Sequence, residues 1–248
     1  MWNQLLRETN HRPWPLPERP YAMTMTWEKL LFAHWPISIQ ELRLLVPQSL
    51  ELDTYGGDCW IGVVPFSMRN VGPRFAPKPS YFSTFLELNV RTYVTAGGKP
   101  GVFFFSLDAA NPLAVEIARR WYHLPYFHAR MRQDERDGAI DYLSERTHRG
   151  VATGVFRAIY RPTGPMFRSQ VGSLDEWLTE RYCLYAVDRR GIAHRGEIHH
   201  LPWPLQTAEL NLSINSVADA HGITLGGDPA LIHYVERLDV VAWNPKIV

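Results

Sequence analysis

Hydrophobic and polar residues alternate along many short segments of the chain, and this is the pattern of β-strands with one buried face. Helix signals are fewer: capping residues introduce short helices expected at 38–46, 112–122 and 173–181. The expected strands are 27–37, 51–55, 59–67, 84–94, 102–107, 126–134, 140–145, 153–160, 183–187, 192–199, 208–212 and 231–241. Strands therefore dominate the predicted structure.

Glycine-rich turns join most of these strands as hairpins, for example around residues 56–58, 97–101 and 137–138. So many strands need closure or packing to protect their edges. We therefore predict an α+β, mainly β fold, built on a barrel-like or strongly curved antiparallel-rich sheet with a few short helices.

The chain is expected to have two parts. Residues 1–20 are rich in proline and tryptophan, which predicts an extended arm, and residues 21–248 are expected to form a single domain. Residues 68–81 are rich in Arg, Gly and Pro, which predicts a long irregular loop that serves as a lid or binding loop. Arg69 on this loop is a candidate for binding an anion, and a plain surface charge is the alternative.

Composition excludes several classes of protein. The 248 residues carry 26 Lys+Arg and 25 Asp+Glu, and a net charge of +1 argues against a globally basic nucleic-acid binder. No apolar run approaches the ~18–20 residues of a membrane span, so no membrane association is expected. The two cysteines are expected to be buried free thiols in a reducing compartment, and we predict a cytoplasmic protein.

The segment 85–93 carries the clearest chemical pattern. Alternation places Glu87, Asn89, Arg91 and Tyr93 on one face of a strand and leucine and valine on the other. Either the polar face is solvated, or it lines the inside of a barrel. In the second case Arg91 binds the carboxylate of a small acid, and Glu87, roughly 13 Å along the strand, moves a proton.

Two further candidates follow the expected helix at 112–122. His123 is a candidate acid or base because an imidazole titrates near neutral pH, and Tyr126 is a candidate for binding the ligand. The alternative is a half-buried strand with locally satisfied polar groups. His123 and His128 lack a third metal ligand, so neither a metal nor another cofactor is predicted.

Several segments together resemble a known family. They are RPWPLPERPYAM near the N-terminus, TFLELNVRTYV and GKPGVFFFSLDAANPLAVEIARRWYHLPY between residues 84 and 126, and YVERLDVVAWNPKIV at the C-terminus. They resemble the YqjF-like family of uncharacterised bacterial proteins, which are related to acetoacetate decarboxylase. The resemblance covers residues 13–248 and implies a cone-like β-barrel around a small apolar pocket.

The resemblance also has consequences for the site. Glu87 matches a pocket glutamate of acetoacetate decarboxylases, whereas their Schiff-base lysine falls at Leu124 in an ungapped alignment. Leucine cannot form an imine, so the resemblance supports the fold and the pocket but not the decarboxylation. Related barrels assemble, which makes a homo-oligomer an expectation from resemblance.

Three functions stay open from the sequence, and whether the protein is an enzyme is undecided. The first is a small-molecule-binding barrel for a small organic or keto acid. The second is a lysine-independent lyase or isomerase that uses Glu87 and His123 on an enolisable substrate. The third is a structural or interaction module whose pocket is filled by side chains.

Overall fold

The computed structural model describes residues 2–248, and strands make up most of the regular structure. The helical segments are α1 (Trp2–Leu5), α2 (Ile39–Arg43), α3 (Ser80–Ser83), α4 (Pro112–Trp121), α5 (Leu174–Thr179) and the 3₁₀ turn η1 (Asp219–His221). The strands are β1 (Met23–Ile37), β2 (Glu51–Leu52), β3 (Cys59–Pro73), β4 (Phe85–Ala96), β5 (Lys99–Ala109), β6 (Tyr126–Arg136), β7 (Ala139–Arg146), β8 (Val155–Pro162), β9 (Cys183–Val187), β10 (Ala193–His199), β11 (Gln206–Asn215), β12 (Leu231–Ala242) and β13 (Lys246–Ile247).

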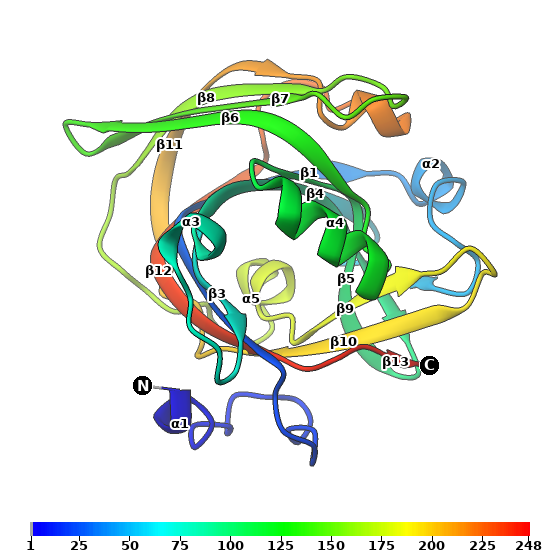
Figure 1. The fold of residues 1–248 in the computed structure, drawn as a ribbon. Coiled ribbons are helices and arrows are strands. Elements are labelled where there is room, and N and C mark those ends of the chain that lie inside the picture. Colours follow the sequence, from blue (N-terminus) through cyan, green and yellow to red (C-terminus); the bar gives the residue numbers. More distant parts are fainter. Residues whose placement is uncertain (1) are drawn as a thin grey trace.

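The strands form one sheet that closes on itself twice (Figure 1). A nine-strand ring runs β5-β6-β7-β8-β11-β12-β1-β3-β4 and closes where β4 pairs with β5. A seven-strand ring shares β12, β1, β3, β4 and β5 and closes through β9 and β10. Closure removes the unpaired strand edges. The prediction of a mainly β, barrel-like fold is therefore confirmed.

The shared strands have a buried cluster on each side. Toward the nine-strand ring, Val63 and Val90 pack in a large cluster with Tyr142. On the opposite side, Phe32 belongs to a cluster with Trp203. Because successive side chains of a strand point to opposite faces, both faces of the shared strands are buried. Figure 1 shows α5 inside the seven-strand ring.

Several local signals act as expected. The side chains of Ser38 and Ser173 accept hydrogen bonds from the backbone N–H groups of Glu41 and Glu176, both at 3.2 Å, and so cap α2 and α5. The β4–β5, β6–β7 and β9–β10 pairs are antiparallel hairpins. These elements depend on nearby residues, and their predictions are confirmed.

Three local predictions are wrong. The segment 51–55 does not form a hairpin with 59–67, because β2 pairs with Val94 and Thr95 of β4. The loop expected at 68–81 begins later, because β3 continues to Pro73 along β1 through register shifts. Arg69 therefore lies on a strand. The expected extended arm begins with the short helix α1.

Gly101 lies where β5 passes very close to β9. A Cβ atom there would be 2.7 Å from both the carbonyl oxygen and the Sγ of Cys183. Overpacking against backbone costs about 1–3 kcal/mol or more, so we expect Gly101→Ala to lower the melting temperature by roughly 4–10 °C. Gly226→Ala is the control, because nothing lies within 4 Å of its Cβ position. Equal melting temperatures in differential scanning calorimetry would contradict this close approach.

Candidate functional site

The polar face of β4 points into the seven-strand ring. Glu87, Asn89 and Arg91 are only 2%, 5% and 8% exposed, so the interpretation of a solvated face is wrong. The physical reason is the second ring closure, which covers this face with β1, β12 and α5. The opposite face, with Leu88 and Val90, packs in the cluster of the nine-strand ring.

Glu87 is a buried carboxyl group with one side-chain hydrogen bond. The hydroxyl of Tyr126 donates to its Oε2 at 2.8 Å. Burial raises the pKa of Glu87 to about 8, the bond from Tyr126 opposes this shift, and the charge of Asp108 adds to it. Glu87 is therefore largely protonated at neutral pH, and a protonated carboxyl group can donate a hydrogen bond or a proton to a ligand.

Arg91 is a buried cation. Its guanidinium lies over the ring of Phe32 at 5.0 Å, and its Nη2 donates to the hydroxyl of Tyr93 at 3.4 Å and to the carbonyl of Leu178 at 3.3 Å. Within residues 2–248, Arg91 has no carboxylate partner, and its buried Nε has no hydrogen-bond partner. The Oδ1 of Asn89, two residues away, also lacks a partner. A buried cation without a counter-ion is costly, so this position favours an anion.

Two histidines that the sequence analysis missed lie at the Arg91 end of the face. His34 and Tyr93 share a hydrogen bond of 2.7 Å between Nε2 and the hydroxyl, and His233 lies 3.4 Å from Asp175 of α5. Burial lowers the pKa of His34 well below its ordinary value, and the charge of Arg91 adds to this effect. The Nδ1 atoms of both histidines lack a partner. A histidine inside the apolar segment 27–37 was the available signal for His34.

Close packing fixes His34 and Arg91 relative to each other. Gly62 lies between them, and a Cβ atom there would be 3.2 Å from the imidazole and 3.3 Å from the Cγ of Arg91. The ring of Trp177 on α5 packs against that of Tyr93 in a tilted arrangement, with centroids 4.7 Å apart and an interplanar angle of 47°. The ring interior is thus lined by a neutral acid at one end and by a cation with two imidazoles at the other.

The remaining predicted residues divide into one that joins Glu87 and two that lie elsewhere. Tyr126 contacts Glu87, as described. His123 is exposed, and its ring is 5.0 Å from that of His194. Arg69 is exposed on β3 and forms an ion pair of 2.6 Å with Glu28. Neither of these two extends the polar face of β4.

Leu124 packs in the apolar cluster that contains Tyr126 and Leu107. The position that the family resemblance assigns to a lysine is thus a hydrocarbon contact beside the partner of Glu87. In the described part of the chain, no group of three or more His, Cys, Asp or Glu side chains is placed to hold a metal ion. No helix among residues 2–248 has the length and apolar character to cross a membrane.

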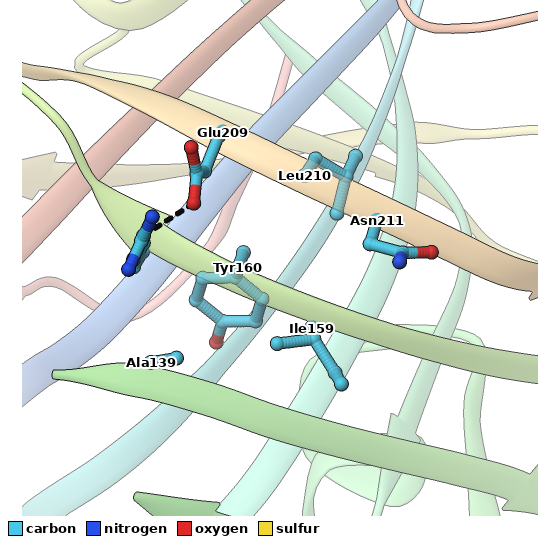
Figure 2. A pocket seen from close by; sticks show the side chains of 7 residues that line it. Ala139, Ile159, Tyr160, Glu209, Leu210 and Asn211 are labelled. Atoms are coloured by element: carbon cyan, nitrogen blue, oxygen red, sulfur yellow. Dashed lines mark ion pairs between the residues drawn. The ribbon is translucent and has the colours of Figure 1, made fainter. Parts of the chain in front are cut away.

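Two surface hollows lie away from this face. One, of about 440 Å³, lies over β8 and β11, and Ile159, Arg161 and Asn211 are among its lining residues (Figure 2). Its polar side chains are largely satisfied, because Arg161 pairs with Glu209 across the two strands. The other is lined by residues of the N-terminal segment, among them His11.

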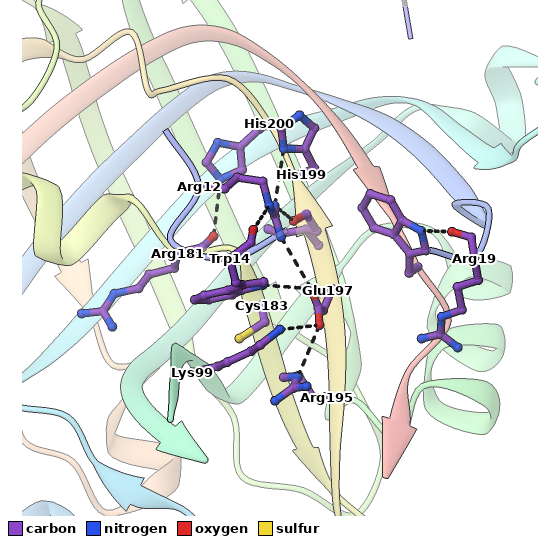
Figure 3. A network of polar contacts seen from close by, with 12 residues as sticks. Arg12, Trp14, Arg19, Lys99, Arg181, Cys183, Arg195, Glu197, His199 and His200 are labelled. Atoms are coloured by element: carbon purple, nitrogen blue, oxygen red, sulfur yellow. Dashed lines mark hydrogen bonds and ion pairs between the residues drawn. The ribbon is translucent and has the colours of Figure 1, made fainter. Parts of the chain in front are cut away.

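A polar network fastens the N-terminal arm to β10 (Figure 3). Glu197 is buried and accepts hydrogen bonds from the indole of Trp14 at 3.0 Å and from Lys99 at 3.1 Å. The guanidinium of Arg12 lies 3.5 Å from the same carboxylate and donates to the carbonyl of Ile198 at 2.6 Å. Burial raises the pKa of Glu197, but the hydrogen bonds from Trp14 and Lys99 and the charges of Lys99 and Arg195 outweigh it, so the pKa lies below its ordinary value. The arm is therefore held by ionic contacts as well as by apolar packing.

Comparison with known proteins agrees with the resemblance noted in the sequence. The model of the DUF2071 family, described as an uncharacterized conserved protein, matches residues 24–239. The uncharacterized protein YqjF of Bacillus subtilis (strain 168) is 48% identical over 228 residues, which are 92% of this chain and 93% of YqjF.

Solved structures share the fold at low sequence identity. Acetoacetate decarboxylase from Legionella pneumophila has a TM-score of 0.60 at 12% identity, over 98% of this chain and 94% of its own. The enduracididine biosynthesis enzyme MppR, complexed with pyruvate, has a TM-score of 0.61 at 10% identity, over 97% of this chain and 94% of its own. The acetoacetate decarboxylase-like fold is therefore established, and the sequence matches show that the chain belongs to the DUF2071 family and is similar to YqjF.

Proposed function

We propose that this chain binds a small organic or keto acid inside the seven-strand ring. Arg91 holds the carboxylate of the ligand, and the protonated carboxyl group of Glu87 donates to a carbonyl oxygen. The fold supports this proposal, because MppR, a structural neighbour, binds pyruvate.

One observation carries the proposal. Arg91 is buried, has no carboxylate partner among residues 2–248, and lies on the same strand face as a carboxyl group whose pKa is raised to about 8. A ligand carboxylate would neutralise the guanidinium in a medium of low dielectric, where a charge-assisted hydrogen bond is strongest.

A second candidate function is acid–base catalysis on an enolisable substrate. The raised pKa of Glu87 favours it, because an acid or base works best when its pKa is near the operating pH. Of the two residues expected opposite Glu87, Tyr126 contacts its carboxyl group, whereas His123 is exposed beside His194. Loss of substrate in the presence of the protein, abolished in Glu87→Gln, would distinguish turnover from binding.

Binding is measured by isothermal titration calorimetry of the full chain with keto and hydroxy acids of three to eight carbons. We expect Arg91→Gln to weaken binding by about 10- to 100-fold, because a hydrogen bond to a charged group contributes roughly 1.5–3 kcal/mol. Arg69→Gln removes the same charge at an exposed position and is the matched control. Equal affinities of the two variants would contradict the role of Arg91, and no binding by the unsubstituted protein would favour a filled interaction module.

Imine chemistry is tested separately by borohydride reduction with the same acids, followed by intact mass measurement. We expect no adduct, because leucine occupies position 124 and no lysine contacts Glu87 or Arg91 among the contacts described for residues 2–248. Acetoacetate decarboxylase is the positive control. Burial lowers the pKa of Lys78, so an adduct would be retested in Lys78→Met.

Cellular setting is part of the same proposal. Cys59 and Cys183 are buried free thiols, which supports a reducing compartment and therefore the cytoplasm. The near-zero net charge supports a small-molecule ligand in preference to nucleic acid. A homo-oligomer stays a proposal from the resemblance to related barrels.

A further inference from the structure

Three cations beside β10 share a single carboxylate (Figure 3). The Nζ of Lys99, at the start of β5, lies 3.1 Å from the Oε1 of Glu197, and the Nε of Arg195 lies 3.6 Å from the same oxygen. The Nη2 of Arg12 on the arm lies 3.5 Å from Oε2. Within residues 2–248, no other carboxylate forms an ion pair with any of these cations. The cluster therefore has two more positive charges than negative charges.

Most of this excess charge is buried. The side chains of Arg12 and Arg195 are 1% and 8% exposed, and that of Lys99 is 25% exposed. The Nη2 of Arg12 and the Nε of Arg195 are buried and have no hydrogen-bond partner. Arg195 also interacts with the hydroxyl of Tyr185, which is neutral because burial raises its pKa. Buried cations are costly without anions to balance them, and Glu197 is one anion for three cations, so the cluster favours a second anion.

Another lysine of similar exposure has the opposite ratio of charges around it. Lys29 of β1 is 23% exposed and forms ion pairs with two carboxylates, those of Glu135 and Glu236. Lys99 instead shares its carboxylate with two arginines. The two lysines therefore differ in the number of anions around them and not in their exposure.

The cluster is open to solvent at the turn between β4 and β5. Gly97 and Gly98 in this turn are exposed and have no side chains to cover the cations. Apart from the adjoining residues, the one described atom within 4 Å of the Cβ position of Gly97 is the Nη1 of Arg195, at 3.9 Å. No described atom lies that close to the Cβ position of Gly98. A small anion can therefore approach the guanidinium of Arg195 over the turn.

Charge and donor groups indicate which anion fits. An excess of two positive charges matches a dianion better than a single carboxylate. The ammonium group of Lys99 and the guanidinium of Arg195 are donors that bind phosphate oxygens through charge-assisted hydrogen bonds. They contact the same oxygen of Glu197, so one small anion can reach both. Lys246 of β13 is exposed and lies opposite Arg195 in register, which adds a positive charge on the same face.

We propose that the β4–β5 turn, Lys99 and Arg195 form a surface site for a phosphate group, either of free phosphate or of a phosphomonoester. Arg12 lies behind these residues and adds to the positive charge. The site uses none of the residues on the polar face of β4. It is therefore independent of the proposed acid-binding function.

The test is isothermal titration calorimetry of the full chain at pH 7.5 with inorganic phosphate, glycerol 3-phosphate and acetate, at an ionic strength held constant with sodium chloride. We expect the phosphates to bind with a Kd of about 1 mM or below, and acetate to bind at least about tenfold less tightly. Equal affinities for the two phosphates would mean that the phosphate group alone is recognised, whereas a preference for one of them would identify the source.

Substitutions place the binding at this cluster. Lys99→Met and Arg195→Gln are each expected to weaken phosphate binding by about 10- to 100-fold, because each removes a charged donor. Lys29→Met is the matched control and is expected to retain the affinity. Glu197→Gln removes the competing carboxylate and is expected to tighten binding by about tenfold. Lys99 is the more exposed of the two cations, so Lys99→Met tests the site even if Arg195→Gln fails to fold.

Amide chemical shifts in a ¹H–¹⁵N titration locate the bound phosphate. We expect Gly97 and Gly98 to show some of the largest changes. Equal phosphate affinities of Lys99→Met and Lys29→Met, or shift changes confined to another face, would overturn the proposed site. Binding of acetate as tightly as phosphate would overturn the choice of ligand, and no binding of either phosphate would overturn the proposal as a whole.

Discussion

Replacing Arg146 by methionine is expected to lower the free energy of unfolding by about 3–5 kcal/mol, because it leaves a buried carboxylate without its partner. Asp108 on β5 and Arg146 on β7 form a two-point contact, with Nε to Oδ1 at 2.7 Å and Nη2 to Oδ2 at 3.2 Å. Asp108 is 0% exposed. The guanidinium also lies 4.6 Å from the ring of Phe127, which methionine replaces only in part.

Urea denaturation of a double-mutant cycle isolates the ion pair from the packing. Asp108→Asn combined with Arg146→Met is expected to recover much of the loss, since the unpaired charge is removed. Arg161→Met is the surface control, and its exposed pair with Glu209 is expected to contribute at most about 1 kcal/mol. A loss below about 1 kcal/mol in Arg146→Met would mean that Asp108 is already neutral, the direction in which burial shifts its pKa.

The same pair links the two interiors of the protein. The charge of Asp108 raises the pKa of Glu87, although the two residues belong to different strands and their side chains point into different rings. Tyr142, on β7 with Arg146, donates to the backbone carbonyl of Glu87 at 2.8 Å. A substitution in the nine-strand ring therefore acts on the acid in the seven-strand ring.

The sequence predicts those parts of the fold that depend on neighbouring residues, and it does not predict those that depend on contacts between segments distant in the chain. The β4–β5 and β6–β7 hairpins are correctly predicted because alternation and turn residues are local signals. The pairing of β2 with β4 and the double closure through β5 and β12 are contacts between distant segments. Local sequence patterns do not determine which distant strand a given strand pairs with. The closure of the seven-strand ring is therefore seen only in the structure.

In the candidate site, too, the local features are predicted from the sequence and the long-range contacts are not. Period-two alternation places Glu87, Asn89, Arg91 and Tyr93 on one face, and the structure has them there. His34 and His233 come from β1 and β12, far away in sequence, and only ring closure brings them to Arg91. Residues expected on one loop or turn, such as Arg69, depend on where β3 ends, and its register shifts along β1 are not encoded in an alternating pattern.

Glu87→Gln is expected to change the pH dependence of stability more than any other conservative substitution described here. The pKa of Glu87 is about 8 in the folded protein and 4.5 in its ordinary state. Between these values the folded state holds a proton that the unfolded state has lost, so the free energy of unfolding falls as pH rises, by about 1.4 kcal/mol per pH unit. The stabilisation is complete below pH 4.5 and is lost as pH rises through 8.

Glutamine resembles the protonated carboxyl group in shape and does not titrate. The unfolding free energy of Glu87→Gln therefore does not fall with rising pH on account of this residue. All other groups titrate in both proteins, and the difference between their unfolding free energies is therefore expected to change by about 4 kcal/mol from pH 5 to pH 8, in favour of Glu87→Gln at high pH. Urea denaturation at several pH values measures this difference, and Glu209→Gln at an exposed position is the control. Parallel plots of unfolding free energy against pH for the two proteins would mean that Glu87 is ionised in the folded protein.

Tyr126→Phe removes a hydrogen bond that favours the ionised form of Glu87 and so raises the pKa of Glu87 further. In the same urea measurements, the unfolding free energy of Tyr126→Phe is therefore expected to keep falling to a higher pH than that of the unsubstituted protein.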